Sequence, residues 1–453
     1  MMLPERFTES ILKELGEEEG SALCAALETL PPVSLRIHPS KGRVPNACEQ
    51  IPWSPFGYYL NQRPLFTLDP AFHGGCYYVQ EASSQFVGHL FADVDLTGRR
   101  ILDLCAAPGG KATLYASLVG SEGLVVANEV NRQRAQVLAD NVRKWGTGNI
   151  LVTIEEASRV AEFEDGFDVV AVDAPCSGEG MFRKAEEARA EWSEGNVTLC
   201  AVRQGELLRE AWRALKPGGL LIYSTCTFNR TEDEEVLEKF SLWAEAAVVR
   251  AHEVTCERSW GIVCGTVGGF QTFRFFPHRT KGEGFFIAVA RKAFDAGGRA
   301  RSPKARRSML TTVDKQSRIE LERWVLAPQQ MQFALIGDTY YGYYCTQMES
   351  VKRLAEALNV IYSGVAMGQL FKGRLKPDPA LAFFCGLNRE ALPEAPLETE
   401  EALNYLRRKE LSATLFTEGM NLVTAEGVAL GFAKRIGGRV NNLYPNALRI
   451  LNK

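Results

Sequence analysis

The sequence predicts an α/β fold in which a mostly parallel, doubly wound sheet carries helices on both faces. A small α/β module precedes this sheet and an α+β domain follows it. Short apolar runs alternate with helix-compatible segments over about 200 residues from Tyr77 onward, which is the pattern of repeated βαβ units. The first run, Ile101 to Leu104, leads into a glycine-rich turn that opens a second apolar segment. Such a turn is typical of the ligand-binding edge of this kind of sheet.

Residues 1–75 are expected to form the N-terminal module. Hydrophobic periodicity predicts helices over residues 4–15 and 21–30, the second ending at Pro31 and Pro32. Alternation over residues 33–37 predicts a strand with Arg36 on its polar side.

Residues 76–292 are expected to form the central α/β domain. The predicted order is a helix at 80–91, strands at 101–104 and 124–128, a helix at 131–145, strands at 150–153 and 167–172, a helix at 197–215, a strand at 220–224, and a closing antiparallel pair at 273–276 and 284–290.

The remaining chain is divided by composition. Residues 293–310 are expected to be a basic linker, since five of the nine residues from Arg299 to Arg307 are basic and almost none can be buried. An intermediate domain (311–391) follows, and a compositional break at 392–401 introduces a last domain (392–453). Short strands are expected there at 422–424, 428–432 and 448–450.

Composition narrows the functional class. Hydrophobic residues make up 46% of the chain and charged residues 24%, and no apolar run approaches the 18 residues of a membrane span. The 11 cysteines are scattered without C-x-x-C pairs, which disfavours zinc and disulfides and favours the reducing cytoplasm. The start of the sequence lacks the features of a secretory signal.

Charge is distributed unevenly along the chain. Residues 291–453 carry 24 Lys and Arg against 16 Asp and Glu, whereas the preceding part carries 28 against 39. The asymmetry indicates that the C-terminal third contacts a polyanion, although a solvated surface explains it equally well.

Candidate ligand-binding groups follow the predicted strands. The turn after Asp103 is neither G-x-G-x-x-G nor a P-loop, which disfavours dinucleotides and nucleoside triphosphates. Further acids follow later strands at Glu129, Glu156 and Asp173. Together they suit a ligand with hydroxyl and cationic groups, with Glu129 placed for ribose hydroxyls. Taken singly, each acid is better explained as a helix N-cap or a first-turn charge. No histidine accompanies them at metal-ligand spacing, so we expect no metal.

Two cysteines directly follow strands at this edge. Cys176 and Cys226 each lie in a tight polar turn. Buried structural cysteine is the usual alternative, but two at strand ends of one sheet indicate nucleophilic chemistry on carbon. Lys111 and Arg183 are candidates for the positive charge that would lower a thiol pKa.

Three motifs together resemble the RNA 5-methylcytosine methyltransferases of the Nop/Sun type. They are D-L-C-A-A-P-G-G-K (103–111), D-A-P-C-S-G-E-G (173–180) and S-T-C-T-F (224–228). The likeness extends to V-Q-E-A-S-S (79–84), to the F-P-H-R-T-K-G-E-G-F-F segment, and to a tail that resembles the PUA-like RNA-binding end of the bacterial ribosomal branch.

The resemblance implies a Rossmann-like methyltransferase domain that uses S-adenosylmethionine, between RNA-binding N- and C-terminal parts. It implies that Cys226 is the nucleophile, that Cys176 assists loss of the carbon 5 proton or release of the adduct, and that Asp173 holds or protonates the cytosine ring. The implied cofactor residues are Cys105, Ala106, Ala107, Pro108, Gly109, Gly110, Lys111, Glu129, Glu156 and Asp173.

The chain departs from the family pattern at two positions. Glu156 stands where Asp is expected, and Asp233 where Asn is more frequent; neither change removes a catalytic group.

The resemblance also implies the RNA substrate and its contacts. Small-subunit ribosomal RNA is the expected substrate and tRNA the alternative. We expect a monomer without a membrane partner. Basic residues of the C-terminal third are expected to contact RNA phosphates: Lys372, Arg374, Lys376, Arg407, Arg408, Lys409, Lys434, Arg435 and Arg439.

The sequence leaves two alternative functions open. A DNA cytosine methyltransferase would use the cysteine of a Pro-Cys pair, which is Cys176 here. A non-catalytic RNA-binding or ribosome-assembly protein would keep the fold without the reaction.

Overall fold

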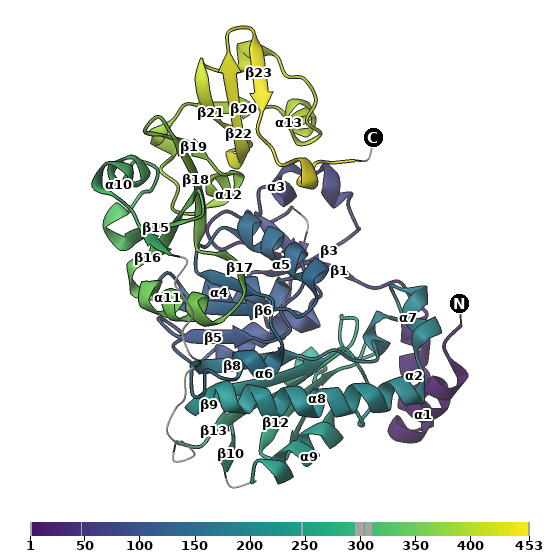
Figure 1. The fold of residues 1–453 in the computed structure, drawn as a ribbon. Helices are drawn as coiled ribbons and strands as arrows, with labels where there is room; N and C mark the ends of the chain where they lie inside the picture. The colour runs from purple at the N-terminus through teal and green to yellow at the C-terminus, as the bar shows by residue number, and fades with distance from the viewer. Residues whose placement is uncertain (1, 47, 246–247, 295–302, 304–309, 452–453) are drawn as a thin grey trace.

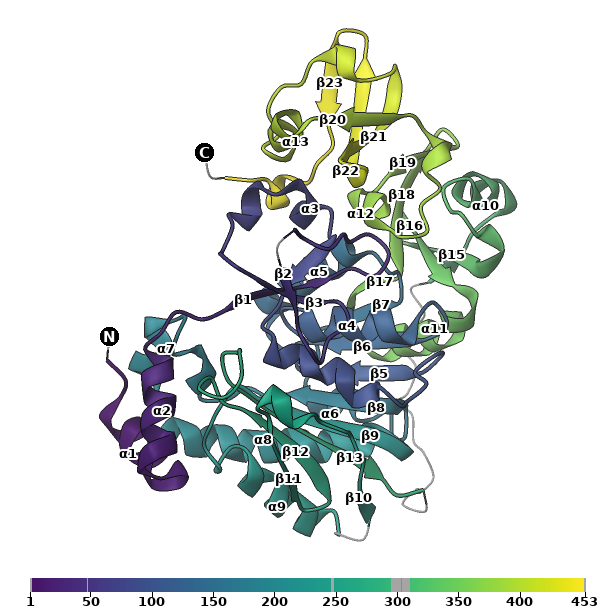
Figure 2. The same ribbon diagram turned by 180° about the vertical axis from the view of Figure 1, so that it is seen from behind.

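The computed structural model describes the chain except residues 1, 47, 246–247, 295–302, 304–309 and 452–453. Most of the expected linker at 293–310 lies outside the described residues. Figures 1 and 2 show the central α/β domain with the N-terminal helices on one side and the C-terminal domain at the far end. Within the described ranges, no helix is long and apolar enough to cross a membrane.

The N-terminal segment divides between two places in the molecule. Its elements are α1 (Glu5–Leu15), α2 (Glu17–Leu27), β1 (Val33–Ile37), β2 (Cys48–Gln50), β3 (Gly57–Leu60), η1 (Phe66–Leu68), α3 (Pro70–His73) and β4 (Tyr77–Val79). The strands form an antiparallel sheet in the order β2-β3-β1-β4, so the sheet extends past the expected boundary at residue 75. The helices instead share a core with Phe182, Phe228 and Phe276 of the central domain. They lie apart from the sheet in both views (Figures 1 and 2).

Arg36, which was expected on the polar side of its strand, is buried in the structure. Its side chain is buried, donates to Gln80 Oε1 at 2.8 Å, and stacks over the Trp145 ring at 4.4 Å. It also donates to Gly110 O at 3.0 Å and to Thr113 Oγ1 at 2.7 Å. Burial lowers the pKa of Arg36 to about 9. This residue therefore ties the N-terminal sheet to the glycine turn and the helix that follows it.

The central domain confirms the predicted α/β class. Its elements are η2 (Ser83–Phe91), β5 (Arg100–Asp103), α4 (Gly110–Val119), β6 (Leu124–Asn128), α5 (Arg132–Trp145), β7 (Ile150–Thr153), α6 (Ala157–Val160), β8 (Phe167–Asp173), η3 (Glu179–Met181), α7 (Glu186–Glu191), α8 (Glu194–Ala214), β9 (Leu215–Thr225), α9 (Glu234–Trp243), β10 (Val249–Ala251), η5 (Arg258–Trp260), β11 (Val263–Val267), β12 (Phe270–Phe275) and β13 (Phe285–Lys292). The segment expected as a helix at 80–91 is a 3₁₀ helix over 83–91.

The sheet has the strand order β11-β12-β13-β9-β8-β5-β6-β7-β17, with β10 paired to β13. The strands from β9 to β7 run parallel, and the predicted closing pair, β12 and β13, runs antiparallel beside β9. Both faces are covered, as a parallel sheet requires. One core contains side chains of η2, α4 and α5, and the other contains side chains of α8, α9 and α11 (Met348–Ala357).

Residues 311–391 are joined to the central sheet. Their further elements are β14 (Thr311–Thr312), α10 (Lys315–Glu322), η6 (Pro328–Gln330), β15 (Met331–Ile336), β16 (Thr339–Tyr344), η7 (Cys345–Gln347), β17 (Val360–Ser363), β18 (Val365–Phe371), β19 (Arg374–Pro377), α12 (Pro379–Phe383) and η8 (Arg389–Ala391). Five strands form their own sheet, β14-β15-β16-β18-β19, but β17 pairs with β7 of the central sheet. The expected intermediate domain therefore shares backbone hydrogen bonds with the central domain.

The C-terminal domain is α+β, as predicted. It contains β20 (Glu394–Leu397), α13 (Thr399–Leu406), η9 (Ala413–Leu415), β21 (Gly419–Ala425), β22 (Val428–Ile436), β23 (Arg439–Asn442) and η10 (Asn446–Leu448), with sheet order β20-β21-β22-β23. The strand predicted at 448–450 is wrong. A 3₁₀ turn begins there after Pro445, and the edge strand is β23. The compositional break at 392–401 also holds a strand, β20.

Candidate active site

The carboxyl ends of β5, β6, β8 and β9 meet at one edge of the sheet. Asp103 ends β5, Glu129 follows β6, and Asp173 ends β8. Asp173 lies opposite Ser224 of β9 in the parallel register. Cys176 and Cys226 follow these two neighbouring strands, so the alternation seen in the sequence brings both cysteines to the same place.

The two cysteine side chains are in contact. Their Sγ atoms lie 3.1 Å apart, and both residues are free thiols. The Gly180 amide donates to Cys226 O at 2.7 Å, which joins the two turns through the backbone. The neighbouring Cys226 thiol and burial together raise the pKa of Cys176 well above its ordinary value. Cys176 therefore keeps its proton and can donate it to a sulfur beside it.

Asp173 lies next to this pair in a polar setting. Its Oδ2 is 2.8 Å from Lys111 Nζ, and its Oδ1 accepts from Ser224 Oγ at 2.7 Å. The Asp173 side chain remains 35% exposed. Lys111 also lies over the Phe285 ring at 4.9 Å. The lysine thus orients the carboxylate, while one side of that carboxylate stays open to a ligand.

The glycine-rich turn is held by backbone contacts on both sides. The Ala106 amide donates to Asn128 O at 2.8 Å, Arg134 donates to Ala107 O at 3.0 Å, and Asn141 donates to Pro108 O at 2.9 Å. Gly109 adopts φ 111°, which disfavours other residues, and α4 begins at Gly110. Burial raises the pKa of the Cys105 thiol, so this third cysteine is a poor nucleophile.

Two buried carboxylates face this turn with unused hydrogen-bonding capacity. Neither oxygen of Asp103 has a hydrogen-bond partner among the described residues. Burial, reinforced by the Asp173 charge, raises the pKa of Asp103 to about 7. Glu129 accepts the Asn131 amide at 2.9 Å through Oε1, and its Oε2 lies 3.4 Å from Arg134. Orphaned carboxylate oxygens beside a glycine turn suit a ligand that carries an amine and hydroxyls.

Two of the residues predicted for the site, Glu156 and Arg183, do not lie in the buried cluster formed by the others. Glu156 follows β7 and precedes α6, but its side chain is exposed. Arg183 was a candidate for charge beside the cysteines. Its guanidinium instead donates to Thr29 O, Leu30 O and Gly282 O, and so binds the end of the N-terminal helices. Of the two cations proposed from the sequence, Lys111 is the one that lies at this edge, where it pairs with Asp173.

Buried acids beneath the two cysteine turns were not assigned a role from the sequence. Asp233 accepts from Thr225 Oγ1 at 2.6 Å and from Thr227 Oγ1 at 3.1 Å, and so holds both neighbours of Cys226. Glu232 accepts the amide next to Cys176, that of Ser177, at 2.9 Å. In the sequence, the one sign of this support is that position 233 holds Asp, whereas the family more often has Asn there. These acids are positioning residues, because they act through the residues that flank the thiols.

Arg274 neutralises this acidic layer. It binds both oxygens of Glu234, lies 3.5 Å from Asp233, and donates to Phe228 O at 2.6 Å. Those acid charges raise the pKa of Arg274 against the effect of burial.

We expect Arg274→Met to destabilise the protein by about 3–5 kcal/mol, because it leaves Asp233 and Glu234 buried without their cation. Urea unfolding would measure the loss. The matched change Arg279→Met removes an exposed pair with Glu19 and should cost at most about 1 kcal/mol. Equal effects of the two substitutions would contradict the role given to Arg274.

Comparison with known proteins agrees with this geometry. Residues 95–291 match the family model of the 16S rRNA methyltransferases RsmB/F, residues 3–82 that of the RsmF N-terminal domain, and residues 393–450 that of the RsmF PUA domain. The ribosomal RNA small subunit methyltransferase F of Shewanella loihica is 31% identical, covering 88% of this chain and 83% of its own. The protein of that name from Salmonella arizonae is 33% identical, covering 88% and 84%.

The chain belongs to the ribosomal RNA small subunit methyltransferase F family. Among solved structures, a methyltransferase homologue from Pyrococcus horikoshii is similar, with a TM-score of 0.52 and 26% identity over 64% of this chain and 95% of that one. The family confirms the resemblance found in the sequence, the Rossmann-like methyltransferase fold with a PUA domain, and S-adenosylmethionine as the cofactor. The protein is an S-adenosylmethionine-dependent RNA methyltransferase.

Proposed function

We propose that the protein transfers a methyl group from S-adenosylmethionine to carbon 5 of a cytosine in small-subunit ribosomal RNA, through a covalent adduct with Cys226. The observation that carries this proposal is the contact between two thiols beside Asp173 and Lys111. Carbon 5 of cytosine is a weak nucleophile, so an activating addition at carbon 6 explains why a thiol is needed at this edge.

The proposed reaction has three steps, which are addition of a thiolate, methyl transfer and elimination. The Cys226 thiolate forms a bond to carbon 6, which pushes the electron pair of the carbon 5–carbon 6 double bond toward carbon 5. The cofactor supplies the methyl group that carbon 5 then takes. A base takes the carbon 5 proton, which restores the double bond as the bond from Cys226 to carbon 6 breaks. Cys176 can be that base when its own proton passes to the departing Cys226 sulfur, 3.1 Å away.

Cys176 is the group nearest to Cys226 when the bond from Cys226 to carbon 6 breaks. Its raised pKa makes it a poor nucleophile and a suitable proton carrier beside the leaving sulfur. We take Cys226 as the attacking residue because the family resemblance implies it; a reaction of the DNA type would use Cys176 instead. We assign Cys176 to proton transfer or adduct release.

Asp173 would hold the cytosine ring at nitrogen 3. Its side chain is 35% exposed in the free protein, so an inserted base can reach it. The target base must be unstacked, which costs a few kcal/mol in a duplex and less in a loop.

The cofactor would lie on the turn from Cys105 to Lys111, with Glu129 at its ribose. Glu156 would lie near the adenine and Asp173 near the methionine part. We add Asp103 to this set, because its buried and unpartnered oxygens suit the amino group of the methionine part.

The raised pKa of Asp103 predicts a pH effect on stability and on ligand binding, which can be measured without following methyl transfer. Its pKa in the folded protein, about 7, lies above the ordinary value of 3.8. The folded state therefore binds more protons than the unfolded state between these values, and this group's contribution to stability falls as pH rises from about 4 to about 7. Binding of S-adenosylhomocysteine near pH 7 should ionise Asp103 and release a proton.

Calorimetry in buffers of different ionisation enthalpy would count that proton. We expect Asp103→Asn to abolish the release and to weaken binding by about 1.5–3 kcal/mol, while Glu156→Gln leaves the release unchanged. Proton release that persists in Asp103→Asn would assign the shift to another group.

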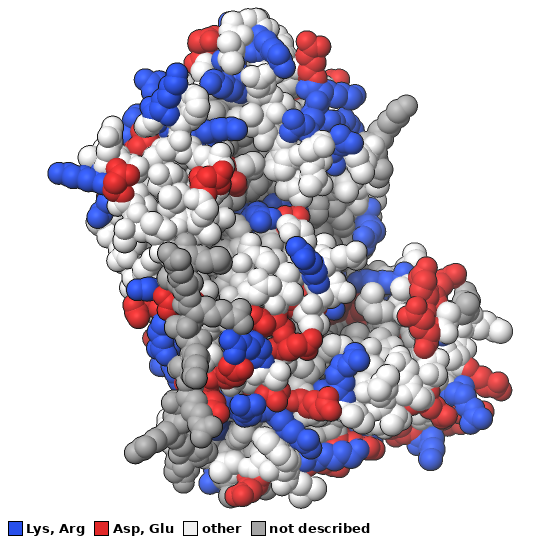
Figure 3. Space-filling view, viewed as in Figure 1, with Lys and Arg blue, Asp and Glu red and all other residues white. Residues whose placement is uncertain are grey.

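Basic residues of the C-terminal domain are proposed to bind RNA phosphates. On the face shown in Figure 3, several Lys and Arg side chains lie at the C-terminal end of the molecule, interspersed with acidic groups. Lys409 and Arg439 border one pocket there. Lys409→Gln should lower the slope of log affinity against log salt by about 0.7–0.9. An unchanged slope would exclude Lys409 from the interface.

The main experiment is methyl transfer from labelled cofactor to three substrates: ribosomal RNA from cells lacking the gene, tRNA, and duplex DNA. We expect label only in ribosomal RNA, and only as 5-methylcytosine by mass spectrometry. Label in tRNA or DNA alone would contradict the substrate assignment. RNA binding without any methyl transfer, to bare RNA or to the small ribosomal subunit, would favour the assembly-protein alternative. The cytoplasmic location, the monomeric state and the absence of a metal stay predictions.

A further inference from the structure

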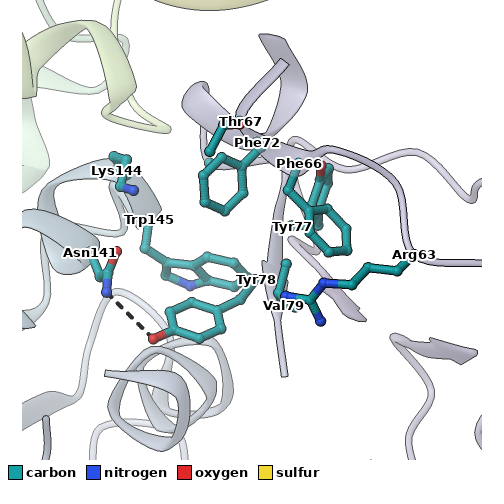
Figure 4. A pocket seen from close by; sticks show the side chains of 11 residues that line it. Arg63, Phe66, Thr67, Phe72, Tyr77, Tyr78, Val79, Asn141, Lys144 and Trp145 are labelled. Atoms are coloured by element: carbon teal, nitrogen blue, oxygen red, sulfur yellow. Dashed lines mark hydrogen bonds between the residues drawn. The ribbon is translucent and has the colours of Figure 1, made fainter. Parts of the chain in front are cut away.

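A second pocket lies away from the cysteine pair, between the N-terminal sheet and α5 (Figure 4). Its volume of about 350 Å³ is in the range that holds a small organic ligand. One wall comes from η1, α3 and β4, and the other from the C-terminal end of α5. The aromatic side chains that line it are Phe66, Phe72, Tyr77, Tyr78 and Trp145.

Positive charge accompanies these rings. Lys144 Nζ lies 5.0 Å from the centre of the Phe72 ring, and the Arg63 guanidinium lies 5.6 Å from that of Phe66. Neither cation forms an ion pair with a described residue. The Phe72, Tyr77 and Tyr78 rings are half-buried, and the Asp140 carboxylate, which pairs with Arg143, acts on Lys144 only electrostatically. Partly accessible rings beside cations without a close ion pair are a combination that binds single-stranded nucleic acid, since bases stack and phosphates pair.

The pocket shares a wall with the cofactor turn. Tyr78 Oη donates to Pro108 O at 3.2 Å, and Asn141 donates to the same oxygen at 2.9 Å and to Tyr78 Oη at 3.4 Å (Figure 4). On its other side, α3 is backed by the C-terminal domain, where Tyr444 Oη lies 3.3 Å from His73 Nδ1. The pocket thus lies between the cofactor turn and the domain proposed to bind phosphates.

We propose that this pocket binds one unstacked nucleotide of the substrate RNA, outside the target cytosine. Its base packs against the Phe72 and Tyr78 rings, and its phosphate lies near Lys144 and Arg63. Trp145, which is almost fully buried, forms the floor. This inference rests on the proposed function for the identity of the RNA. It adds a second point of contact that fixes the strand relative to the catalytic edge.

Photo-crosslinking tests the site directly. A short single-stranded RNA of random sequence that carries 4-thiouridine would be irradiated with the full-length protein, and the modified peptides mapped. We expect crosslinks in the peptides that contain Phe72 and Tyr78. Crosslinks confined to other surfaces, with none at the pocket, would overturn the proposal.

Affinity for the same RNA provides the second measurement. Phe72→Leu keeps an apolar side chain but removes the stacking surface, and should weaken binding between about fivefold and about 100-fold. Phe72→Tyr should restore binding. Lys144→Gln should weaken binding as well, whereas Lys352→Gln, an exposed lysine on α11 that does not line the pocket, should not. Affinities unchanged in both Phe72→Leu and Lys144→Gln would overturn the proposal.

The two proposals can fail separately. Lys144→Gln should raise the KM for RNA and leave kcat at saturating RNA unchanged, because it is remote from the cysteine pair. A wild-type protein that binds and crosslinks RNA at the pocket but transfers no methyl group would contradict the proposed function alone. Normal methyl transfer with an unaltered KM in Lys144→Gln would contradict the pocket alone.

Discussion

Cys226→Ala should reduce methyl transfer by at least about 10⁴-fold, because it removes the proposed nucleophile. Cys176 is held in its protonated form by burial and by the Cys226 thiol, and burial also raises the pKa of Cys105. Labelled methyl transfer to ribosomal RNA would measure the loss. Binding of RNA and of S-adenosylhomocysteine should remain close to wild type.

The free and exposed Cys345 offers a matched control, since Cys345→Ala should keep full activity. RNA that contains 5-fluorocytosine would identify the attacking residue independently. Fluorine at carbon 5 blocks the final proton loss, so the adduct should persist and map to Cys226. An adduct at Cys176, or activity that survives in Cys226→Ala, would reverse the assignment of the two cysteines.

Cys176→Ala should stop the reaction at a later stage and leave a covalent protein–RNA adduct. The substitution removes the sulfur that lies 3.1 Å from Cys226, and with it the nearest group for proton transfer during release. On denaturing gels we expect a slowly migrating protein–RNA species, which should form only when both the RNA substrate and the cofactor are present. The rate of repeated turnover should fall, although each enzyme molecule should still methylate one RNA.

The double variant Cys176→Ala, Cys226→Ala separates release from attack. It should show no adduct, because the attacking thiol is absent. Loss of activity in Cys176→Ala without an adduct would instead give Cys176 a role before or during attack. Thermal unfolding of each variant would exclude a merely structural effect, since both thiols lie in turns held by Glu232 and Asp233.

The composition of the catalytic edge could be predicted from the sequence for a simple geometric reason. In a parallel sheet all strands end at the same edge, so residues that directly follow strands must meet. Asp103, Asp173, Cys176 and Cys226 followed from this rule once the strands were located. The periodicity of short apolar runs is local and survives in one sequence without an alignment.

Features that depend on contacts distant in sequence could not be predicted in this way. The alternation along its strand predicts only that Arg36 lies on the polar side, because the folded chain alone places Gln80, Gly110 and Trp145 around it. Arg183 appeared to be near the cysteines in sequence, yet its partners are backbone carbonyls of the N-terminal helices and of Gly282. Long polar side chains reach partners that local patterns do not specify.

The sequence by itself determined the α/β class, the strand-end residues and the methyltransferase family, because these depend on hydrophobic period and on motifs read along the chain. The tertiary structure decided how the parts are joined. It placed β17 beside β7, set the N-terminal helices against the catalytic turns, and put Asp233 beneath Thr225 and Thr227. It also opened the aromatic pocket between β4 and α5. These outcomes depend on packing between surfaces that meet only when the chain folds, and no local pattern records them.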